Sequence, residues 1–294
     1  MLPRLRPALL AALALQLASC ASGPAPAPPS EPPAPAPRPR DAATAASLER
    51  VLGGEHRSAE NRARDAARHP LDTLLFFGIK PNMTVAEVWP GPDGWYTEIL
   101  APLLADAGKL YVAQMPAAPG NEFATASLAH YSAKLAARPD LYGRVTLTTL
   151  GPTGTGIAPP GSCDLVVTFR NLHNWMNLGY ARQAFDAMNR ALKPGGILGV
   201  VEHRADPARP RDPRASNGYV NEEYAIELIE SAGFELVERS QINANPKDTK
   251  DYEQGVWSLP PTLRQGKRDR EKLEAIGESD RFTLKFRKRS DPIS

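Results

Sequence analysis

Residues 84–97, TVAEVWPGPDGWYT, decide the fold of this chain. The stretch opens with a short apolar run, turns at two prolines and two glycines, and leads into a second apolar segment at residues 96–105. A strand, a glycine-containing turn and a helix in this order are typical of the first unit of an α/β sheet. The glycines allow the backbone of the turn to approach a ligand at the positive end of the helix.

The same alternation continues along the rest of the chain. We expect strands over residues 84–89, 109–114, 144–150, 164–169, 197–202, 234–239 and, running antiparallel, 282–287. Helical patterns cover residues 42–68, 71–77, 96–105, 122–137, 181–192 and 221–232. The pattern predicts an α/β fold: a doubly wound, Rossmann-like sheet that is mostly parallel, with an antiparallel last strand and helices on both faces. Ligands of such sheets bind at the carboxyl ends of the strands.

The composition bounds the function. The chain has 294 residues, of which 42% are hydrophobic, so one full-sized core is expected. A formal net charge of +2 argues against a nucleic-acid partner held by bulk electrostatics. Two cysteines cannot form a disulfide framework or a four-thiolate zinc site, and we expect no metal ion.

The first forty residues differ from the rest. Arg4 and Arg6 precede a short apolar run at residues 8–17, as in a secretory signal. Nine of the 30 prolines lie between Ala21 and Arg40, which indicates an extended tether. We therefore expect a signal peptide over residues 1–19, a Pro/Ala-rich tether over 20–40, and one domain over 41–294.

Residues 17–20, LASC, resemble the lipobox of bacterial lipoproteins. The resemblance implies that Cys20 is acylated and that the exported protein is anchored to a membrane through this lipid. Ala21 and Ser22 provide no aspartate retention signal, so the resemblance favours the periplasmic side of the outer membrane. The alternative is an ordinary signal peptide in which the cysteine is accidental.

Four polar residues follow the buried strand predicted at residues 164–169: Arg170, Asn171, His173 and Asn174. Packing alone does not explain such a group at the end of a strand. His173 is the candidate general base, because a histidine exchanges a proton near neutral pH. Arg170 stays charged and suits an anionic group, whereas Asn171 can orient a ligand but cannot act as a base.

A second polar pair, Glu202 and His203, ends the strand predicted at residues 197–202 and lies near the same edge of the sheet. For His173 the competing interpretation is a structural, hydrogen-bonded histidine. His56, Arg57 and Asn61 either close over the ligand or form an exposed polar helix.

The sequence resembles the class I S-adenosylmethionine-dependent methyltransferases. Their first motif is an acidic residue before a glycine-rich turn, as at Glu87 and residues 91–94, and an LKPGG signature like residues 192–196 precedes their fifth strand. A family of predicted bacterial methyltransferases matches more closely. Its strings stand here as EVWPG (87–91), GWYTEIL (94–100), RNLHNW (170–175) and INANPKDT (242–249).

The resemblance implies S-adenosylmethionine as cofactor and a role for the loop at residues 170–174 beside the transferred methyl group. It implies cofactor contacts from Glu87, Trp89, Gly91, Gly94, Trp95 and Gln114. Two residues depart from the general pattern: Trp89 stands where most enzymes have the first glycine, and Gln114 replaces the acid that binds the ribose hydroxyls.

Each of these residues also has a structural interpretation. Glu87 could be a solvated strand-end carboxylate, and the two tryptophans could pack in the core. The glycines could serve the turn alone, and residues 243–249 could form an Asx turn instead of contacting substrate.

The expected function is methyl transfer to an unknown acceptor. The alternative is an exported, non-catalytic lipoprotein that binds a ligand or partner on a degenerate methyltransferase fold, since S-adenosylmethionine is made in the cytoplasm. A nicotinamide-dependent oxidoreductase is disfavoured, because the Gly-x-Gly-x-x-Gly fingerprint is absent.

The location can be tested by substitution of Cys20. If Cys20 carries the lipid, Cys20→Ser moves the protein from the membrane fraction to the soluble envelope fraction, as cell fractionation would show. A variant that stays membrane-bound, or a wild-type protein found at full length in the cytoplasm, would contradict the assignment.

Overall fold

The computed structural model describes residues 41–152 and 156–290. The predicted signal peptide and tether, with Cys20, lie outside the described residues. No helix among the described residues has the length and apolar character needed to cross a membrane.

A seven-stranded sheet forms the centre of the described domain, with strand order β3-β2-β1-β4-β5-β7-β6. The strands are β1 (Thr84–Val88), β2 (Lys109–Gln114), β3 (Val145–Thr149), β4 (Cys163–Phe169), β5 (Leu192–His203), β6 (Phe234–Ser240) and β7 (Arg281–Lys288). The first five pair in parallel, and β7 runs antiparallel between β5 and β6. The predicted fold class and the antiparallel last strand are confirmed.

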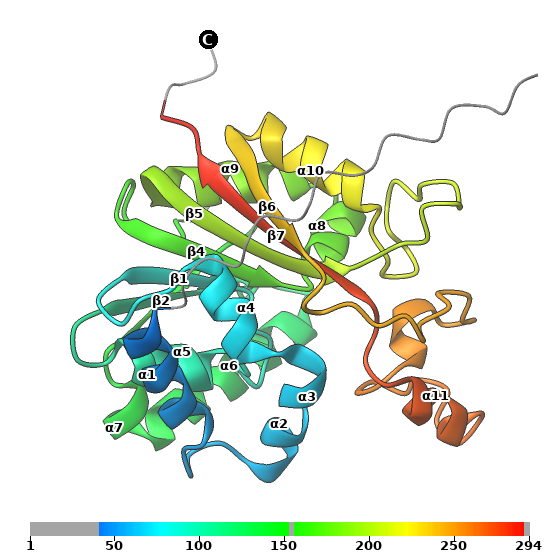
Figure 1. Ribbon diagram of the computed structural model, residues 1–294, viewed down its shortest axis with the longest axis horizontal. Helices are drawn as coiled ribbons and strands as arrows, with labels where there is room; N and C mark the ends of the chain where they lie inside the picture. The colour runs from blue at the N-terminus through cyan, green and yellow to red at the C-terminus, as the bar shows by residue number, and fades with distance from the viewer. Residues whose placement is uncertain (1–40, 153–155, 291–294) are drawn as a thin grey trace, which may run out of the picture. The chain divides into compact units, whose positions relative to one another are not determined.

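Helices cover both faces of the sheet, because alternate residues of each central strand point to opposite sides. Val85 of β1 packs in the core with α1 (Ala42–Leu52), α4 (Pro70–Phe77) and α5 (Thr97–Leu104). Ala86 packs with the helices of the other face, which are α8 (Leu172–Leu178), α9 (Ala181–Ala191) and α10 (Glu222–Ser231). Figure 1 shows α9 and α10 on one side of the sheet and α1, α4 and α5 on the other.

The stretch at residues 42–68, predicted as one helical segment, forms three helices. They are α1, α2 (Ala59–Ala63) and α3 (Asp65–Arg68). Gly53 caps the end of α1, and the side chain of Ser58 accepts a hydrogen bond from the Asn61 N–H at the start of α2. Glycine disfavours the helix interior and serine favours its first position, so the segment breaks there.

Other helices are α6 (Glu122–Ala137), which has the predicted bounds, α7 (Pro139–Tyr142), α11 (Arg270–Ile276) and a 3₁₀ turn, η1 (Gly255–Ser258). The prediction of a loop at residues 170–174 holds for Arg170 and Asn171 and was wrong from Leu172 onward, where α8 begins. The sequence 193–196, predicted to separate a helix from a strand, lies inside β5.

The topology brings distant segments to one edge of the sheet. Since β1, β2, β4 and β5 are parallel, their carboxyl ends share that edge. Because β7 is antiparallel to β5, its first residue lies there too, with His203 opposite Arg281. The segment that precedes β7 therefore reaches the place where ligands are expected.

Glu87 of β1 is buried beneath this edge. Its carboxylate accepts a 2.6 Å hydrogen bond from the Thr97 hydroxyl, and that hydroxyl lies 2.8 Å from the Tyr131 hydroxyl. Burial raises the pKa of Glu87 to about 7, although the hydrogen bond from Thr97 and the charge of Lys134 oppose the rise. The folded protein therefore retains a proton on Glu87 that the unfolded chain loses near pH 4.5.

The burial of Glu87 predicts a pH-dependent stability. As pH rises from about 4.5 to about 7, the unfolding free energy falls by on the order of 3 kcal/mol, because the folded state holds the extra proton. Glu87→Gln keeps an oxygen that accepts from Thr97 and removes this decline. Denaturant unfolding at several pH values measures it, with the half-exposed Glu235→Gln as control. Equal pH dependence in Glu87→Gln and wild type would contradict the assignment.

Candidate functional site

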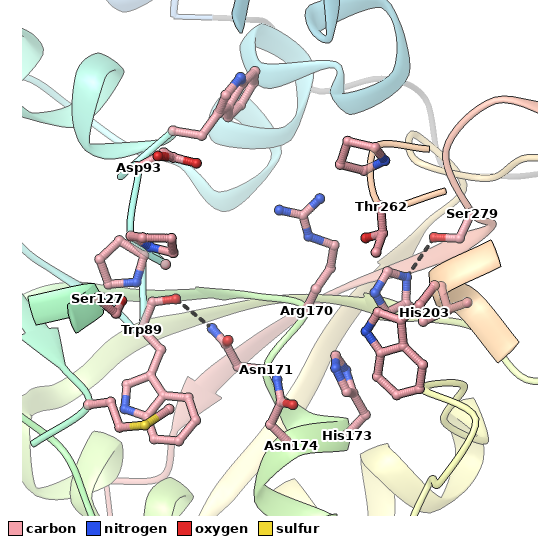
Figure 2. Close-up of a pocket in the computed structure, with 18 of the residues that line it drawn as sticks. Trp89, Asp93, Ser127, Arg170, Asn171, His173, Asn174, His203, Thr262 and Ser279 are labelled. Carbon is pink, nitrogen blue, oxygen red and sulfur yellow. Dashed lines mark hydrogen bonds between the residues drawn. The ribbon is translucent and has the colours of Figure 1, made fainter. Parts of the chain in front are cut away.

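A cavity of about 600 Å³ opens at this edge of the sheet. Its wall comes from the turn after β1, the end of β2, the start of α6, the start of α8, the end of β5 and the segment before β7 (Figure 2). The predicted site residues that line it are Trp89, Gly91, Trp95, Gln114, Arg170, Asn171 and His173. Glu87 and Gly94 are absent from this wall, so direct cofactor contact through them has no support in the geometry.

Trp89 turns the chain after β1 and anchors the turn in the core. Its φ is +51°, a left-handed value that is uncommon for a non-glycine residue. The indole N–H donates to the Leu150 carbonyl at 3.0 Å, and the ring packs edge-on against Trp175 and Tyr180. Core packing, the structural interpretation, therefore describes most of this side chain.

Gly91 and Gly94 play different parts in the turn. Gly91 has φ +77°, and a Cβ built on it would meet no atom within 4 Å, so its backbone borders open space. A Cβ on Gly94 would come within 2.6 Å of the Tyr131 ring and 2.9 Å of the Thr97 hydroxyl. Gly94 therefore allows the turn to pack on the helices below it.

Gln114 ends β2 beside the same turn. Its side-chain amide donates to the Gly91 carbonyl at 3.3 Å, and the side chain is buried. The amide nitrogen thus fixes the turn, and the carbonyl oxygen of the side chain is the group that can accept from a ligand.

Trp95 connects the turn to the N-terminal helices. Its indole N–H donates to the Asn61 carbonyl at 3.1 Å, and the guanidinium groups of Arg57 and Arg68 lie 5.1 and 4.7 Å from its ring centre. These arginines take the cation–π contacts that the Trp95 ring could otherwise make with a ligand cation. Arg57 is buried, so an exposed polar helix does not describe this segment.

Arg170 and Asn171 form the junction between β4 and α8. Arg170 has φ +62°, and its backbone N–H donates to the Val201 carbonyl at 2.7 Å. The Asn171 amide donates to the carbonyls of Val88 and Trp89, both at 3.0 Å. Asn171 therefore ties the end of β1 to the end of β4, and we assign it to positioning these ends, not to the reacting groups.

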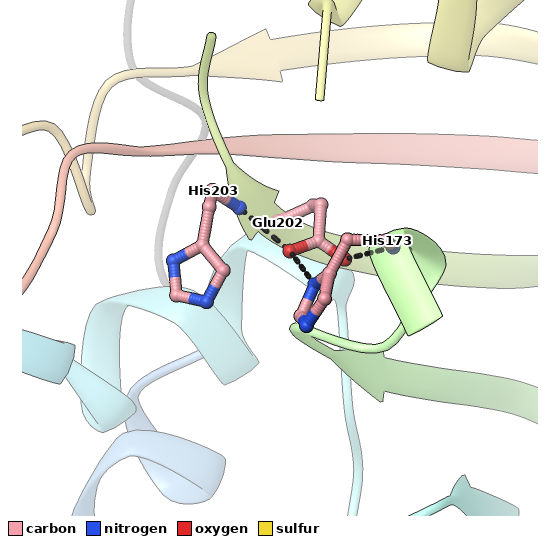
Figure 3. Close-up of side chains that lie close together, drawn as sticks. All are labelled: His173, Glu202 and His203. Carbon is pink, nitrogen blue, oxygen red and sulfur yellow. Dashed lines mark hydrogen bonds and ion pairs between the residues drawn. The ribbon is translucent and has the colours of Figure 1, made fainter. Parts of the chain in front are cut away.

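His173 is held by Glu202 on the neighbouring strand (Figure 3). The Glu202 carboxylate lies 3.0 Å from His173 Nδ1 and accepts backbone N–H bonds from His173 and His203 at 3.2 and 2.8 Å. Because both Glu202 oxygens already accept backbone N–H groups, we assign the hydrogen of this contact to Nδ1, and Nε2 then keeps its lone pair. His173 lines the cavity and so can take a proton there.

His203 completes this group. Its Nδ1 lies 2.6 Å from the Ser279 hydroxyl. Burial, followed by the charges of His173 and Arg170, holds the pKa of His203 well below its usual range, so it is neutral near pH 7. His173, Glu202 and His203 offer ligand atoms within 4.8 Å of one another, as a metal ion would require. Because both Glu202 oxygens accept protein N–H groups, we assign Glu202 to orienting His173.

Glu278 precedes β7 and faces four arginines. Nε of Arg64 lies 2.8 Å from its carboxylate, Nε of Arg68 3.1 Å, Nη1 of Arg281 3.0 Å and Nη1 of Arg170 3.4 Å. Burial alone would raise the pKa of Glu278, but the four positive charges lower it to about 2. The carboxylate is therefore ionised throughout the neutral range.

Residues 243–249, considered for substrate contact, hold the segment that carries Glu278. The Asn245 amide donates to the Ile276 and Glu278 carbonyls at 2.9 and 2.7 Å. Asp248 accepts from the Tyr219 hydroxyl and from the Asp280 N–H. None of these residues lines the cavity in the described part of the chain, so the motif serves the scaffold.

Sequence reasoning missed Arg68, Glu278 and Ser279 as cavity residues. Arg64 and Arg68 are four positions apart in a helical pattern, which places them on one face and was the available signal. Glu278 carried no local signal, since its position depends on the antiparallel β7.

The comparisons with known proteins rest on structure. No protein-family model matches the chain, and no curated protein matches it. Its fold is similar to a SAM-dependent methyltransferase from Aquifex aeolicus, with TM-score 0.51 and 13% identity over 83% of this chain and 97% of that one. The [4+2]-cyclase SpnF is similar with TM-score 0.56 and 15% identity over 81% of this chain and 86% of that one. The chain therefore has a Rossmann-like methyltransferase fold, which in SpnF carries a protein named as a cyclase.

Proposed function

We propose that the chain is an S-adenosylmethionine-dependent methyltransferase that acts on a small-molecule acceptor of unknown identity. The observation that carries the proposal is the composition of one cavity. In one part of the cavity the open turn at Gly91 meets the side-chain amide of Gln114. In another part the buried Glu202 orients His173.

The residues of the turn end fit a nucleoside. Gly91 leaves space at its backbone, Gln114 offers one carbonyl oxygen to a ribose hydroxyl, and Met115 and Phe123 supply apolar wall. A volume of about 600 Å³ suits a ligand of this size together with an acceptor. The neutral amide of Gln114 accepts more weakly than a carboxylate would.

Methyl transfer requires little from the protein beyond aligning the acceptor with the methyl group of the cofactor. S-adenosylmethionine, when bound, supplies a methyl group activated on its sulfonium. The cavity aligns the acceptor, His173 Nε2 takes the proton that a hydroxyl or amine nucleophile loses, and the hydrogen bond to Glu202 stabilises the resulting imidazolium.

We also propose that this domain is exported and lipid-anchored through Cys20 on the periplasmic side of the outer membrane. Residues 1–40 support the proposal by their signal, lipobox and tether patterns. The alternative function, a non-catalytic ligand-binding lipoprotein, predicts ligand binding in the cavity with no turnover.

Cofactor binding tests the proposal most simply. We expect calorimetry to show that S-adenosylmethionine binds the purified wild-type protein and that NAD does not. Gly91→Val abolishes binding and leaves the circular dichroism spectrum unchanged, because the valine side chain enters the open space and strains the turn.

Gly195→Val is the matched control. Gly195 also has a left-handed φ, +73°, with no atom within 4 Å of an added Cβ, but it lies near the opposite end of the sheet. The Gly195→Val variant therefore has the same kind of backbone strain, and we expect it to retain wild-type cofactor affinity. Equal affinity in wild type and Gly91→Val would place the cofactor elsewhere.

The chemical step tests His173. We expect His173→Asn to lower kcat by about 10²-fold or more with little change in cofactor affinity, because the proton acceptor is lost. The exposed His130→Asn keeps wild-type kinetics. Product mass spectrometry with candidate acceptors provides the assay. Full turnover by His173→Asn would leave alignment as the whole mechanism.

A further inference from the structure

One end of the cavity, where Arg68 packs on the Trp95 ring, carries an excess of positive charge. Arg64, Arg68 and Arg170 line it, Arg281 stands behind them, and Glu278 is the carboxylate to which all four are paired. The other acid of the wall, Asp93, is largely exposed in the turn after β1 and pairs with His130. One negative charge therefore stands against four positive charges at this end.

The electrostatics of the arginines agree with this count. Burial, followed by the like charge of Arg170, lowers the pKa of Arg68 well below its usual range. Burial lowers the pKa of Arg170 as well, and Arg281 and Arg64 add to the effect although Glu278 opposes it. Arginines whose positive charges lower one another's pKa are stabilised when a second anion binds beside them.

The guanidinium groups keep donors for such an anion. Glu278 engages Nε of Arg64 and Nη1 of Arg170, and among the described residues no other hydrogen bond of these two groups is present. About a quarter of each side chain is exposed, 26% for Arg64 and 24% for Arg170. The remaining N–H groups of a guanidinium fork match the two oxygens of a carboxylate or phosphate.

The position of the cluster relates it to the reacting end of the cavity. Arg170 lies three residues before His173, and Glu278 is followed by Ser279, which contacts His203. Figure 2 shows Arg170 between the side of Trp89 and Ser127 and the side of His203 and Ser279. An anion held by these arginines would therefore lie in the same cavity as the candidate base, on the side to which the Arg170 guanidinium points.

We propose that Arg64, Arg68 and Arg170 form an anion-binding subsite that recognises a carboxylate or phosphate group of the methyl acceptor. The acceptor is then an anionic small molecule whose nucleophile lies near His173. This assignment of substrate class rests on the proposed methyl transfer.

The same chemistry could serve the cofactor, whose amino-acid portion carries a carboxylate. Two nucleoside probes separate these sources, because S-adenosylhomocysteine has the carboxylate and methylthioadenosine lacks it. Inorganic phosphate serves as the probe for the acceptor group.

The experiment compares Arg64→Gln and Glu278→Gln with wild type by calorimetry. We expect phosphate to bind the wild-type protein. Arg64→Gln should lower the phosphate affinity by about tenfold or more, and Glu278→Gln, which removes the competing carboxylate, should raise it. Arg62→Gln is the matched control, because Arg62 lies in α2 two residues before Arg64, carries the same charge, is exposed and does not line the cavity. It keeps wild-type phosphate affinity. Should Glu278→Gln fail to fold, the pair Arg64→Gln and Arg62→Gln decides alone.

The outcomes separate this proposal from methyl transfer itself. Unchanged phosphate affinity in Arg64→Gln, with cofactor binding still abolished by Gly91→Val, overturns the anion subsite and leaves the methyltransferase proposal standing. Arg64→Gln that weakens S-adenosylhomocysteine but not methylthioadenosine assigns the arginines to the cofactor and also overturns it. Weakened phosphate binding with unchanged affinity for both nucleosides supports it. A protein that binds phosphate through Arg64 but binds neither nucleoside refutes methyl transfer and, with it, the assignment to a methyl acceptor.

Discussion

The ionised carboxylate of Glu278, buried among four arginines, joins three parts of the chain that are far apart in sequence. Arg64 lies between α2 and α3, and Arg68 ends α3. Arg170 directly follows β4, and Arg281 begins β7. A buried carboxylate is costly unless it is paired, and four arginines without it would repel one another. Each partner is therefore stabilised by the others, and together they form one end of the cavity.

The other end of the cavity depends on hydrogen bonds between strand ends. The Asn171 amide holds the carbonyls of Val88 and Trp89, and the Gln114 amide holds the Gly91 carbonyl. Two non-glycine residues, Trp89 and Arg170, have left-handed φ values next to these bonds. Such strain persists where the surroundings determine the backbone strongly, and it concentrates at functional sites. The turn and the arginine end are thus fixed by different interactions.

The sequence predicted the sheet well because its signals are local. Short apolar runs and glycine turns marked the seven strands, and the antiparallel last strand followed from its alternating pattern. The polar motif at residues 170–175 concealed α8, even though Leu172, Trp175 and Met176 have helical spacing. Glu278 could not be predicted, because β7 inserts beside β5 only through long-range pairing. The roles of Glu87 and Gly94 also needed the structure, since burial decides between a cofactor contact and a packing contact.

A crystal structure with S-adenosylhomocysteine and phosphate bound would test most directly whether the cavity has a nucleoside end and an anion end. We expect the nucleoside against Gly91 and Gln114, the homocysteine sulfur on the side of His173, and phosphate on Arg64 and Arg170. A nucleoside bound over the arginines, or phosphate in the glycine turn, would contradict this division of the cavity.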